Sequence, residues 1–467
     1  MRRVHLKPAE PFTSALINRT GAFNAGALEA ATRIVAQVRE GGDAALRQLT
    51  AQFDGVELEG LRVPQEAIDA ASGQMDPDTL EALQQAARQV RDFHERQVQQ
   101  SWLFTREDGA IVGAKVTPLD SVGIYVPGGR ALYPSTVLMN ALPAQVAGVE
   151  RIVCATPPQA DGTVDAAILA ACKLAGVTEV YTVGGAQAVA ALAYGTETIA
   201  PVDKVTGPGN AYVAAAKKVV SGDVGIDMIA GPSEVCVVAD ETADARLVAI
   251  DLMAQAEHDP LAACYLVCFS EAYADKVESA IEAHMAKSTR ADITRASLDG
   301  QGLIVVVETM AQALQAVNVI APEHLEMHVA HAMEHLGAIR NAGAIFLGEW
   351  TPEAVGDYVA GPNHTLPTGG TARYASPLSV EEFVKKSSII AYSAEALKND
   401  ARAVMQIATH EGLWAHAASV ALRCEALLRE EGVPVGAADA AGRVEGAEAA
   451  GAAGDCDARP AAEGGAA

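Results

Sequence analysis

A glutamine and a histidine, three residues apart, end a long apolar run just before a proline. Gln255 and His258 fall at the end of an expected helix, which Pro260 cannot continue. Residues at this spacing share a helix face, so an amide oxygen and an imidazole nitrogen could approach the same ion. An isolated pair of this kind is typical of a solvated helix end, so a metal site requires further ligands from elsewhere in the chain.

The segment Ala-Pro-Glu-His-Leu at 321–325 offers two bases side by side. Pro322 suits the first position of a helix, which would place Glu323 and His324 in its first turn. A helix dipole disfavours a protonated imidazole there, so His324 would be neutral and able to accept a proton. The Glu323 carboxylate is a second base, which would point in a different direction from His324. A simple capping arrangement would also explain this segment.

Four more polar side chains could complete such a site, namely Asp357, His364, Glu411 and His416. The segment around His364 is rich in Gly and Pro, so backbone chemistry rather than packing sets its shape. Asp, His and Gln side chains together make a mixed nitrogen and oxygen ligand set that suits zinc. The sequence therefore predicts a zinc site, although Mn or Co would accept similar ligands.

Three glycine-rich turns follow strand-like runs. They are Tyr-Val-Pro-Gly-Gly-Arg at 125–130, Val-Gly-Gly-Ala-Gln at 183–187 and Thr-Gly-Pro-Gly-Asn at 206–210. The Gly-x-Gly-x-x-Gly fingerprint of a dinucleotide site is absent from the expected place. Each turn would nevertheless leave backbone N–H groups and a helix N-terminus facing outward, which suits a pyrophosphate or ribose. Turn geometry alone explains any one of them, but three at neighbouring strand ends favour a bound ligand.

The elements that must position these residues alternate along the chain. Strand-like runs at 122–126, 151–155 and 179–183 alternate with helix-like runs at 136–147, 164–175 and 186–194. This alternation is typical of parallel βαβ units and predicts a doubly wound α/β domain. Strand-like runs at 235–238, 265–269, 303–307 and 344–347 predict a second α/β unit, while 8–99 and the segment after 379 are expected to be helical.

Taken together, these segments resemble the histidinol dehydrogenase family over residues 20–430. The resemblance rests on blocks that are common singly but not in this joint order: GIYVPGGR at 123–130, VTGPGN at 205–210, IAGPSE at 229–234, QAEHDP at 255–260, APEHL at 321–325, NAGAIF at 341–346 and GPNH at 361–364. It implies an NAD-linked, zinc-dependent homodimer that oxidises the amino alcohol histidinol through histidinaldehyde to histidine, consuming two NAD per turnover with one zinc per subunit.

The resemblance also implies roles for particular residues. The implied zinc ligands are Gln255, His258, Asp357 and, from the partner subunit, His416. The implied substrate contacts are these ligands together with Ser233, His324, His364 and, from the partner subunit, Glu411. Tyr125, Gln187 and Asn210 would contact NAD. Glu323 and His324 would transfer protons, His324 from the alcohol and Glu323 from the water that hydrates the aldehyde.

We expect two Rossmann-like doubly wound domains with small helical pieces at both ends. Residues 1–25 would form an N-terminal helical arm, and 26–125 with 236–378 would form the domain that carries the metal and acid–base residues. Residues 126–235 would form the domain that contacts NAD, and 379–433 a C-terminal helical domain. The Ala-, Gly- and acid-rich stretch 434–467 lacks large apolar residues and is expected to be a disordered tail.

The composition excludes several other classes of function. The chain has 467 residues and 34 Lys and Arg against 59 Asp and Glu, a formal net charge of -25, which would repel nucleic acids and anionic membranes. Neither a signal peptide nor a membrane span is expected. The seven cysteines are scattered, with no Cys-x-x-Cys spacing, which is typical of reduced thiols in a cytoplasm.

A zinc peptidase is one alternative interpretation. The segment His-Ala-Met-Glu-His at 331–335 fits the His-x-x-Glu-His pattern, and His324, His328, His331 and His335 would form a stripe at helical spacing. The match is short, however, and the Glu between His324 and His328 stands one place too late for His-Glu-x-x-His.

Three further alternatives stay open. Aldehyde oxidation could pass through a thiohemiacetal on Cys154 or Cys236, although neither has a His or Asn nearby in sequence to activate it. A related dehydrogenase that acts on another small alcohol would use the same zinc and base residues equally well. A non-enzymatic binding protein would require all of these groups to be coincidental.

Overall fold

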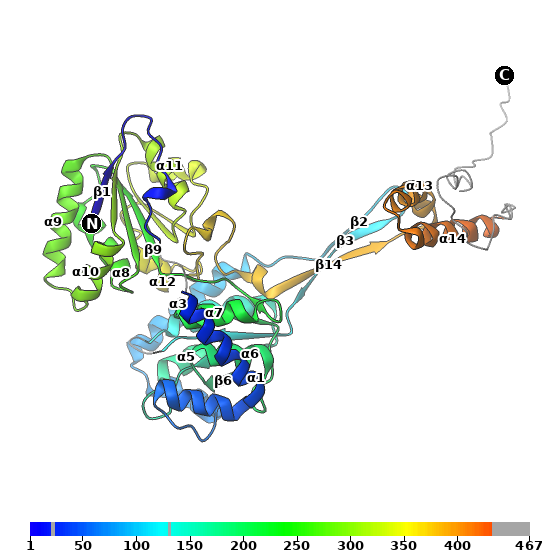
Figure 1. Cartoon of the computed structure of the whole chain (residues 1–467), viewed down its shortest axis with the longest axis horizontal. Coiled ribbons are helices and arrows are strands. Elements are labelled where there is room, and N and C mark those ends of the chain that lie inside the picture. The colour runs from blue at the N-terminus through cyan, green and yellow to red at the C-terminus, as the bar shows by residue number, and fades with distance from the viewer. Residues whose placement is uncertain (20–23, 129–131, 432–467) are drawn as a thin grey trace. The chain divides into compact units, whose positions relative to one another are not determined.

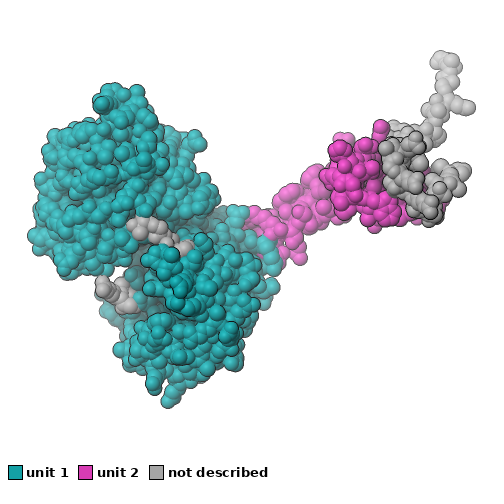
Figure 2. Space-filling view, viewed as in Figure 1, with its two compact units in different colours: residues 1–98, 118–385 teal, residues 99–117, 386–467 magenta. Residues whose placement is uncertain are grey.

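The computed structural model describes residues 1–19, 24–128 and 132–431. The chain forms two compact units, one of residues 1–98 with 118–385 and one of 99–117 with the residues from 386 on (Figure 2). The predicted tail, 434–467, lies outside the described residues. Among those that are described, no helix is both long and apolar enough to cross a membrane.

The first unit contains a six-stranded sheet in which every neighbouring pair is parallel. Its strands, in spatial order, are β1 (Arg2–His5), β11 (Leu303–Val306), β10 (Ala263–Cys268), β9 (Glu234–Ala239), β12 (His324–His328) and β13 (Ala344–Leu347). The central strands β9, β10 and β11 are continuous runs of buried residues because helices cover both faces of a parallel sheet.

Helices lie on both sides of this sheet (Figure 1), and two hydrophobic clusters mark its two faces. One face packs against α8 (Ala245–Ala256), α9 (Glu271–Met285) and α10 (Ala291–Gly300), and the other against α11 (Met310–Ile320). Successive residues of β9 alternate between them, with Val235 on the α8 side and Cys236 on the α11 side. The short helix α12 (Glu353–Tyr358) follows β13.

The first unit also contains a five-stranded parallel sheet. Its strands, in spatial order, are β6 (Glu179–Thr182), β5 (Arg151–Thr156), β4 (Ser121–Tyr125), β7 (Lys204–Thr206) and β8 (Gly225–Ile226). The connecting helices are α4 (Pro134–Ala147), α5 (Ala166–Leu174), α6 (Gly185–Tyr194) and α7 (Ala211–Val220). Both sheets are thus doubly wound, which confirms the predicted α/β fold class.

The N-terminal region differs from the prediction in two respects. Residues 2–5 form a parallel edge strand paired with β11, not a helical arm. The helices that follow are α1 (Ala25–Asp54), α2 (Gln65–Ala70) and α3 (Pro77–Glu95). They pack against the five-stranded sheet, α1 on α6 and α7 and α3 on α4, whereas we expected 26–125 to belong with 236–378. An amphipathic pattern shows that a helix covers an apolar surface but does not say which one.

The second unit is helical only in part. Its helices α13 (Ala394–His410) and α14 (Trp414–Glu430) are equal in length and pack against each other, and helices were expected in the C-terminal region. A three-stranded sheet of β14 (Val384–Ala391), β3 (Ile111–Pro118) and β2 (Trp102–Thr105) was not expected. Its residues are mostly exposed or half-buried, so they lack the buried apolar runs by which the other strands were recognised.

The burial of β12 allows a test of this architecture. Met327 is fully buried in the cluster on the α11 side, whereas Met333 is 67% exposed. We expect Met327→Ala to lower the free energy of unfolding by about 2–5 kcal/mol, because it removes core contacts and leaves a cavity. The matched variant Met333→Ala should change it by less than about 0.5 kcal/mol. Urea denaturation measures both values, and equal effects would contradict the placement of β12.

Candidate metal and acid–base site

Strand β12 carries polar residues on one face only. Leu325 and Met327 point into the cluster on the α11 side. The alternate residues His324, Glu326 and His328 therefore face α8, and all three are buried. A strand with apolar residues on one face and three buried titratable groups on the other is unusual for a purely structural element.

The facing helix α8 supplies a complementary row. Asp251 and Gln255 are four residues apart, and His258 follows three residues later, so these side chains share a helix face. The Asp251 carboxylate lies 3.4 Å from Nε2 of His328, and the Gln255 amide lies 3.1 Å from Nδ1 of His324. We call these six residues the polar seam: Asp251 and Gln255 of α8, His258 just beyond its end, and three residues of β12.

At one end of the polar seam the side chains converge in a pattern that suits a metal ion. The Gln255 amide group lies 3.2 Å from Nδ1 of His258 and 3.1 Å from the Glu353 carboxylate. Two ligands of one tetrahedral zinc ion, each at about 2.1 Å, are separated by a similar distance. The predicted Gln255–His258 pair is therefore brought together.

Helix α12 adds two carboxyl groups to this end. Glu353 and Asp357 are four residues apart, so both reach the same side of α12. Asp357 Oδ1 lies 3.8 Å from Nε2 of His324, Glu353 Oε1 lies 3.7 Å from its Nδ1, and the three residues form a group that could hold a metal ion. Sequence reasoning missed Glu353, although its spacing from Asp357 on a short helix was a usable signal.

The loop after α12 brings in a further imidazole. His364 is half-buried, and its Nδ1 lies 3.0 Å from the backbone oxygen of Asp357. Burial lowers the pKa of His364 to about 4, and burial raises the pKa of Asp357 to about 6. Zinc binds the neutral form of imidazole, so this chemistry, with the amide oxygen and carboxylate nearby, fits a zinc ion.

One of the expected zinc ligands, His416, and one expected substrate contact, Glu411, belong to the second unit. Glu411 follows the last residue of α13 and His416 lies in the first turn of α14, and both are exposed. The predicted ligand set is thus divided between the units, with Gln255, His258 and Asp357 in the first and His416 in the second.

The predicted bases Glu323 and His324 lie beside the predicted metal ligands, but they do not begin a helix as predicted. Ala321 ends α11 in a left-handed conformation with φ of 47°, and β12 begins at His324. The backbone oxygen of Glu323 accepts a hydrogen bond from Ala344 of β13 at 2.8 Å. The prediction was wrong because a proline followed by an acidic residue suits a strand entry as well as a helix start.

Burial, not a helix dipole, sets the charge of both bases. Burial, with smaller contributions from charge repulsion by His258 and His364, lowers the pKa of His324 to about 3. Burial also raises the pKa of Glu323 well above its usual range, although the Glu234 backbone N–H donates to its Oε2 at 2.9 Å. His324 is neutral, and its Nε2 is buried with no hydrogen-bond partner among the described residues. Ser233, the remaining predicted contact, is the half-buried residue just before β9.

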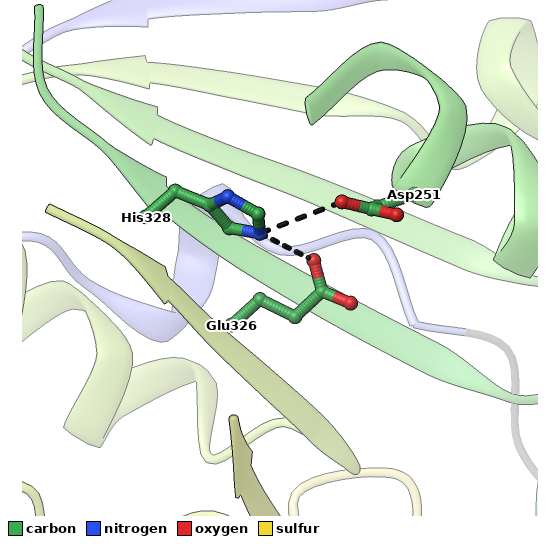
Figure 3. Close-up of side chains that lie close together, drawn as sticks. All are labelled: Asp251, Glu326 and His328. Carbon is green, nitrogen blue, oxygen red and sulfur yellow. Dashed lines mark hydrogen bonds and ion pairs between the residues drawn. The ribbon is translucent and has the colours of Figure 1, made fainter. Parts of the chain in front are cut away.

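The other end of the polar seam is a buried triad. Figure 3 shows Asp251, Glu326 and His328 pointing toward one another, two from β12 and one from α8. Nε2 of His328 lies 3.1 Å from Glu326 Oε2, and Glu326 Oε1 accepts a hydrogen bond from the Glu353 backbone N–H at 2.9 Å. Glu326 therefore links the triad to the residues that surround His324. Sequence reasoning missed this triad because β12 was taken for a helix.

The same finding removes the peptidase interpretation. His324 and His328 lie in a strand, and His331 is exposed in a left-handed conformation with φ of 56°. The four histidines do not form a helical stripe. The thiol route also loses support, because Cys154 and Cys236 are both fully buried and burial raises the pKa of Cys236.

The five-stranded sheet places the predicted dinucleotide loops at one edge. The chain runs from β4 through β5 to β6 and then returns to place β7 on the other side of β4, so the order reverses between β4 and β7. Ligands of doubly wound sheets bind outside the carboxyl ends of strands at such a point. Tyr125 ends β4, and Gly207 follows β7 with φ of 113°.

The three residues expected to contact NAD all lie at strand-to-helix junctions. The Tyr125 hydroxyl accepts a hydrogen bond from the Gly185 backbone N–H at 3.1 Å, and burial raises its pKa to about 12. Asn210 is exposed and caps α7, accepting from Tyr212 N–H at 3.0 Å. Gln187 is buried in the first turn of α6. Arg130, at the end of the first loop, lies outside the described residues.

These features define a class of protein, namely a doubly wound α/β protein with two candidate sites. One parallel sheet carries a buried group of carboxyl and imidazole side chains that could hold a metal ion, and the other carries glycine-rich loops where its strand order reverses. Comparison with known proteins then identifies the family. The family model described as histidinol dehydrogenase matches residues 18–424. The chain belongs to the histidinol dehydrogenase family.

Individual relatives agree with this assignment. The chain is 55% identical to the histidinol dehydrogenase of Geobacillus kaustophilus over 392 residues, which cover 84% of this chain and 92% of that protein. It is 52% identical to that of Bacillus subtilis over 390 residues, covering 84% and 91% of the two chains. The crystal structure of histidinol dehydrogenase from Elizabethkingia anophelis matches with a TM-score of 0.87 and 34% identity, over 91% of this chain and 98% of that one.

The triad makes a prediction about pH and stability. The pKa of Asp251 is raised to about 7, with burial as the largest cause. The folded chain therefore keeps this proton over a range, from about pH 4 to 7, in which the unfolded chain has lost it, and the free energy of unfolding falls as the pH rises. Asp251→Asn removes this contribution, so the variant should gain stability relative to the wild type between pH 5 and 7.

Chemical denaturation at several pH values measures this difference. The exposed Asp92 provides a control, because Asp92→Asn should give a profile parallel to that of the wild type. A parallel profile for Asp251→Asn as well would show that the triad carboxyl titrates normally.

Proposed function

We propose that this protein oxidises L-histidinol through histidinaldehyde to L-histidine, with two NAD molecules as hydride acceptors and one zinc ion per subunit. The observation that carries the proposal is the convergence of Gln255, His258 and Asp357 with the bases Glu323 and His324, in a chain that belongs to the histidinol dehydrogenase family. The closest rival is a related dehydrogenase that acts on another small alcohol. Assays that follow NADH with histidinol and with other small alcohols distinguish the two.

Zinc would be held by Gln255, His258, Asp357 and His416 of the partner subunit. A zinc ion there supplies a binding position for the imidazole and amino nitrogens of the substrate, which orients the alcohol for reaction. Ser233, His364 and the partner subunit's Glu411 would contact the substrate. The mixed donor set and the low pKa of His364 support this assignment.

His324 is the base of the first oxidation. Its neutral imidazole takes the proton of the alcohol while a hydride leaves the same carbon for NAD, which gives the aldehyde, NADH and a protonated His324. The free Nε2 of His324 supports this role, because the atom is buried and unpaired within the described part of the chain. A neutral, unpaired imidazole nitrogen is ready to accept a proton.

Glu323 serves the second oxidation. It would take a proton from water as the water oxygen adds to the aldehyde carbon, while protonated His324 returns its proton to the aldehyde oxygen, which gives the hydrate and a neutral His324. A second hydride then leaves that carbon for a second NAD while His324 accepts a hydroxyl proton of the hydrate, which yields the carboxylic acid. The acid releases its remaining proton to solvent as the carboxylate forms. The raised pKa of the buried Glu323 makes its carboxylate a stronger base than that of an exposed glutamate.

NAD would bind at the carboxyl end of the five-stranded sheet, in contact with Tyr125, Gln187 and Asn210. The working form would be a homodimer in the cytoplasm, because Glu411 and His416 would reach the site of the partner. Exposed apolar side chains in the second unit support association, and they include Trp102, Leu103, Phe104 and Ile390. The net charge of -25 argues against nucleic acids as partners.

The division of roles between base and metal can be tested with His324→Asn. We expect turnover of histidinol to fall by about 100-fold or more, because the proton acceptor is lost. Bound zinc, measured by elemental analysis, should stay near one per subunit, since His324 is not a ligand. Loss of zinc together with activity would contradict the assignment.

The dinucleotide site can be tested at Gly207. A Cβ atom at this position would lie 2.2 Å from the backbone oxygen of Tyr125, and φ is positive. We expect Gly207→Ala to raise the KM for NAD by about tenfold or more, with the zinc content unchanged. Gly73→Ala is the matched control, because its Cβ would meet no atom within 4 Å. Equal KM values for NAD in both variants would place NAD elsewhere.

A further inference from the structure

The backbone of one residue, Glu234, contacts both proposed bases. Its N–H donates to Oε2 of Glu323 at 2.9 Å, and its carbonyl oxygen lies 3.2 Å from Nδ1 of His324. A hydrogen on Nδ1 that is donated to this carbonyl leaves the lone pair of the imidazole on Nε2. The first residue of β9 therefore sets both the direction of the Glu323 carboxyl group and the tautomer of His324.

The side chain of Glu234 is bound by an arginine from far away in the sequence. Arg19 Nε donates to Glu234 Oε1 at 2.7 Å and Arg19 Nη2 to Oε2 at 3.1 Å, which makes a two-pronged ion pair. Arg19 Nη2 also donates to the backbone oxygen of Ile320, the last residue of α11. One guanidinium thus binds both the start of β9 and the end of the helix that leads to Glu323 and His324.

This ion pair lies on the opposite side of the sheet from the polar seam. Side chains alternate along β9, and Cys236 and Val238 point to the α11 side, so Glu234 points to that side as well. His324 faces α8, on the other side. Neither Arg19 nor the Glu234 carboxylate is among the groups that would contact the substrate or the metal.

We propose that Arg19 and Glu234 are positioning residues, which fix the two bases through the backbone of β9 and the α11–β12 connection. This inference rests on the proposed function, since it takes Glu323 and His324 as the bases. The Glu234 side chain is nearly fully buried, so loss of Arg19 leaves a carboxyl group without its partner and favours its protonation or movement. Any shift of the Glu234 backbone then moves Glu323 and His324 together.

The test compares Arg19→Met with a matched control in the other sheet. Arg151 and Glu179 form a similar two-pronged pair at the starts of β5 and β6, with Nε to Oε1 at 2.8 Å. This pair is at the opposite end of its strands from the glycine-rich loops. Both Arg19→Met and Arg151→Met are expected to lower the melting temperature.

Only Arg19→Met should impair the chemistry. At equal zinc content, its kcat for histidinol should fall by about 10- to 100-fold, the loss that follows from a small misplacement of catalytic groups. Its KM values for histidinol and NAD should change by less than about threefold, and the kcat of Arg151→Met by less than about twofold. The double variant Arg19→Met with Glu234→Gln removes the unpaired charge and should recover about fivefold of the lost kcat.

Other results would overturn the inference. A zinc-loaded Arg19→Met protein with a kcat within about twofold of the wild type shows that the pair only stabilises the fold. If Arg19→Met is insoluble, Arg19→Lys decides, because lysine keeps the charge but lacks the planar fork and should still lower kcat without raising KM. A wild-type protein that does not oxidise histidinol contradicts the proposed function itself, which is a separate outcome.

Discussion

The burial of the polar seam between α8 and β12 is the constraint on which the rest of the site depends. Carboxyl and imidazole groups are costly to remove from water unless they are paired. Here Glu326 connects the two ends of the seam, since it contacts His328 at one end and the backbone of Glu353 beside the other. Because Asp251 and Gln255 of α8 contact His328 and His324 of β12, the helix and the strand must keep a fixed register relative to each other.

The chemistry follows from the same burial. In the interior the uncharged forms of both groups are favoured, because burial lowers the pKa of His324 and raises the pKa of Glu323. Clusters of shifted pKa values inside a fold are typical of functional sites. The apolar face of β12 and the ion pair between Arg19 and Glu234 lie on the other side of the sheet, where they stabilise the strands without contacting the seam.

Local patterns predicted some elements well and others badly. Apolar runs located β4, β5, β6, β9, β10 and β11, because strands buried on both faces are continuous in sequence. The partly exposed edge strand β13 is also an apolar run and was located in the same way. The same criterion missed β12, whose alternate residues are polar, and the exposed strands β2, β3 and β14. Glu353 and the triad were missed for a related reason. Whether such residues form a site depends on which elements pack against each other, and residue type alone does not show this.

The sequence by itself determined the α/β class, the glycine-rich turns and, through the order of its motifs, the family. It also named Gln255, His258, Glu323 and His324, since residue type and spacing are local properties. Only the tertiary structure decided that β12 begins at His324, directly after Glu323, that the helices of residues 25–95 pack on the five-stranded sheet, and that residues 2–5 pair with β11. These are contacts between distant segments, and their free energy depends on the whole packed core and not on any one stretch of chain.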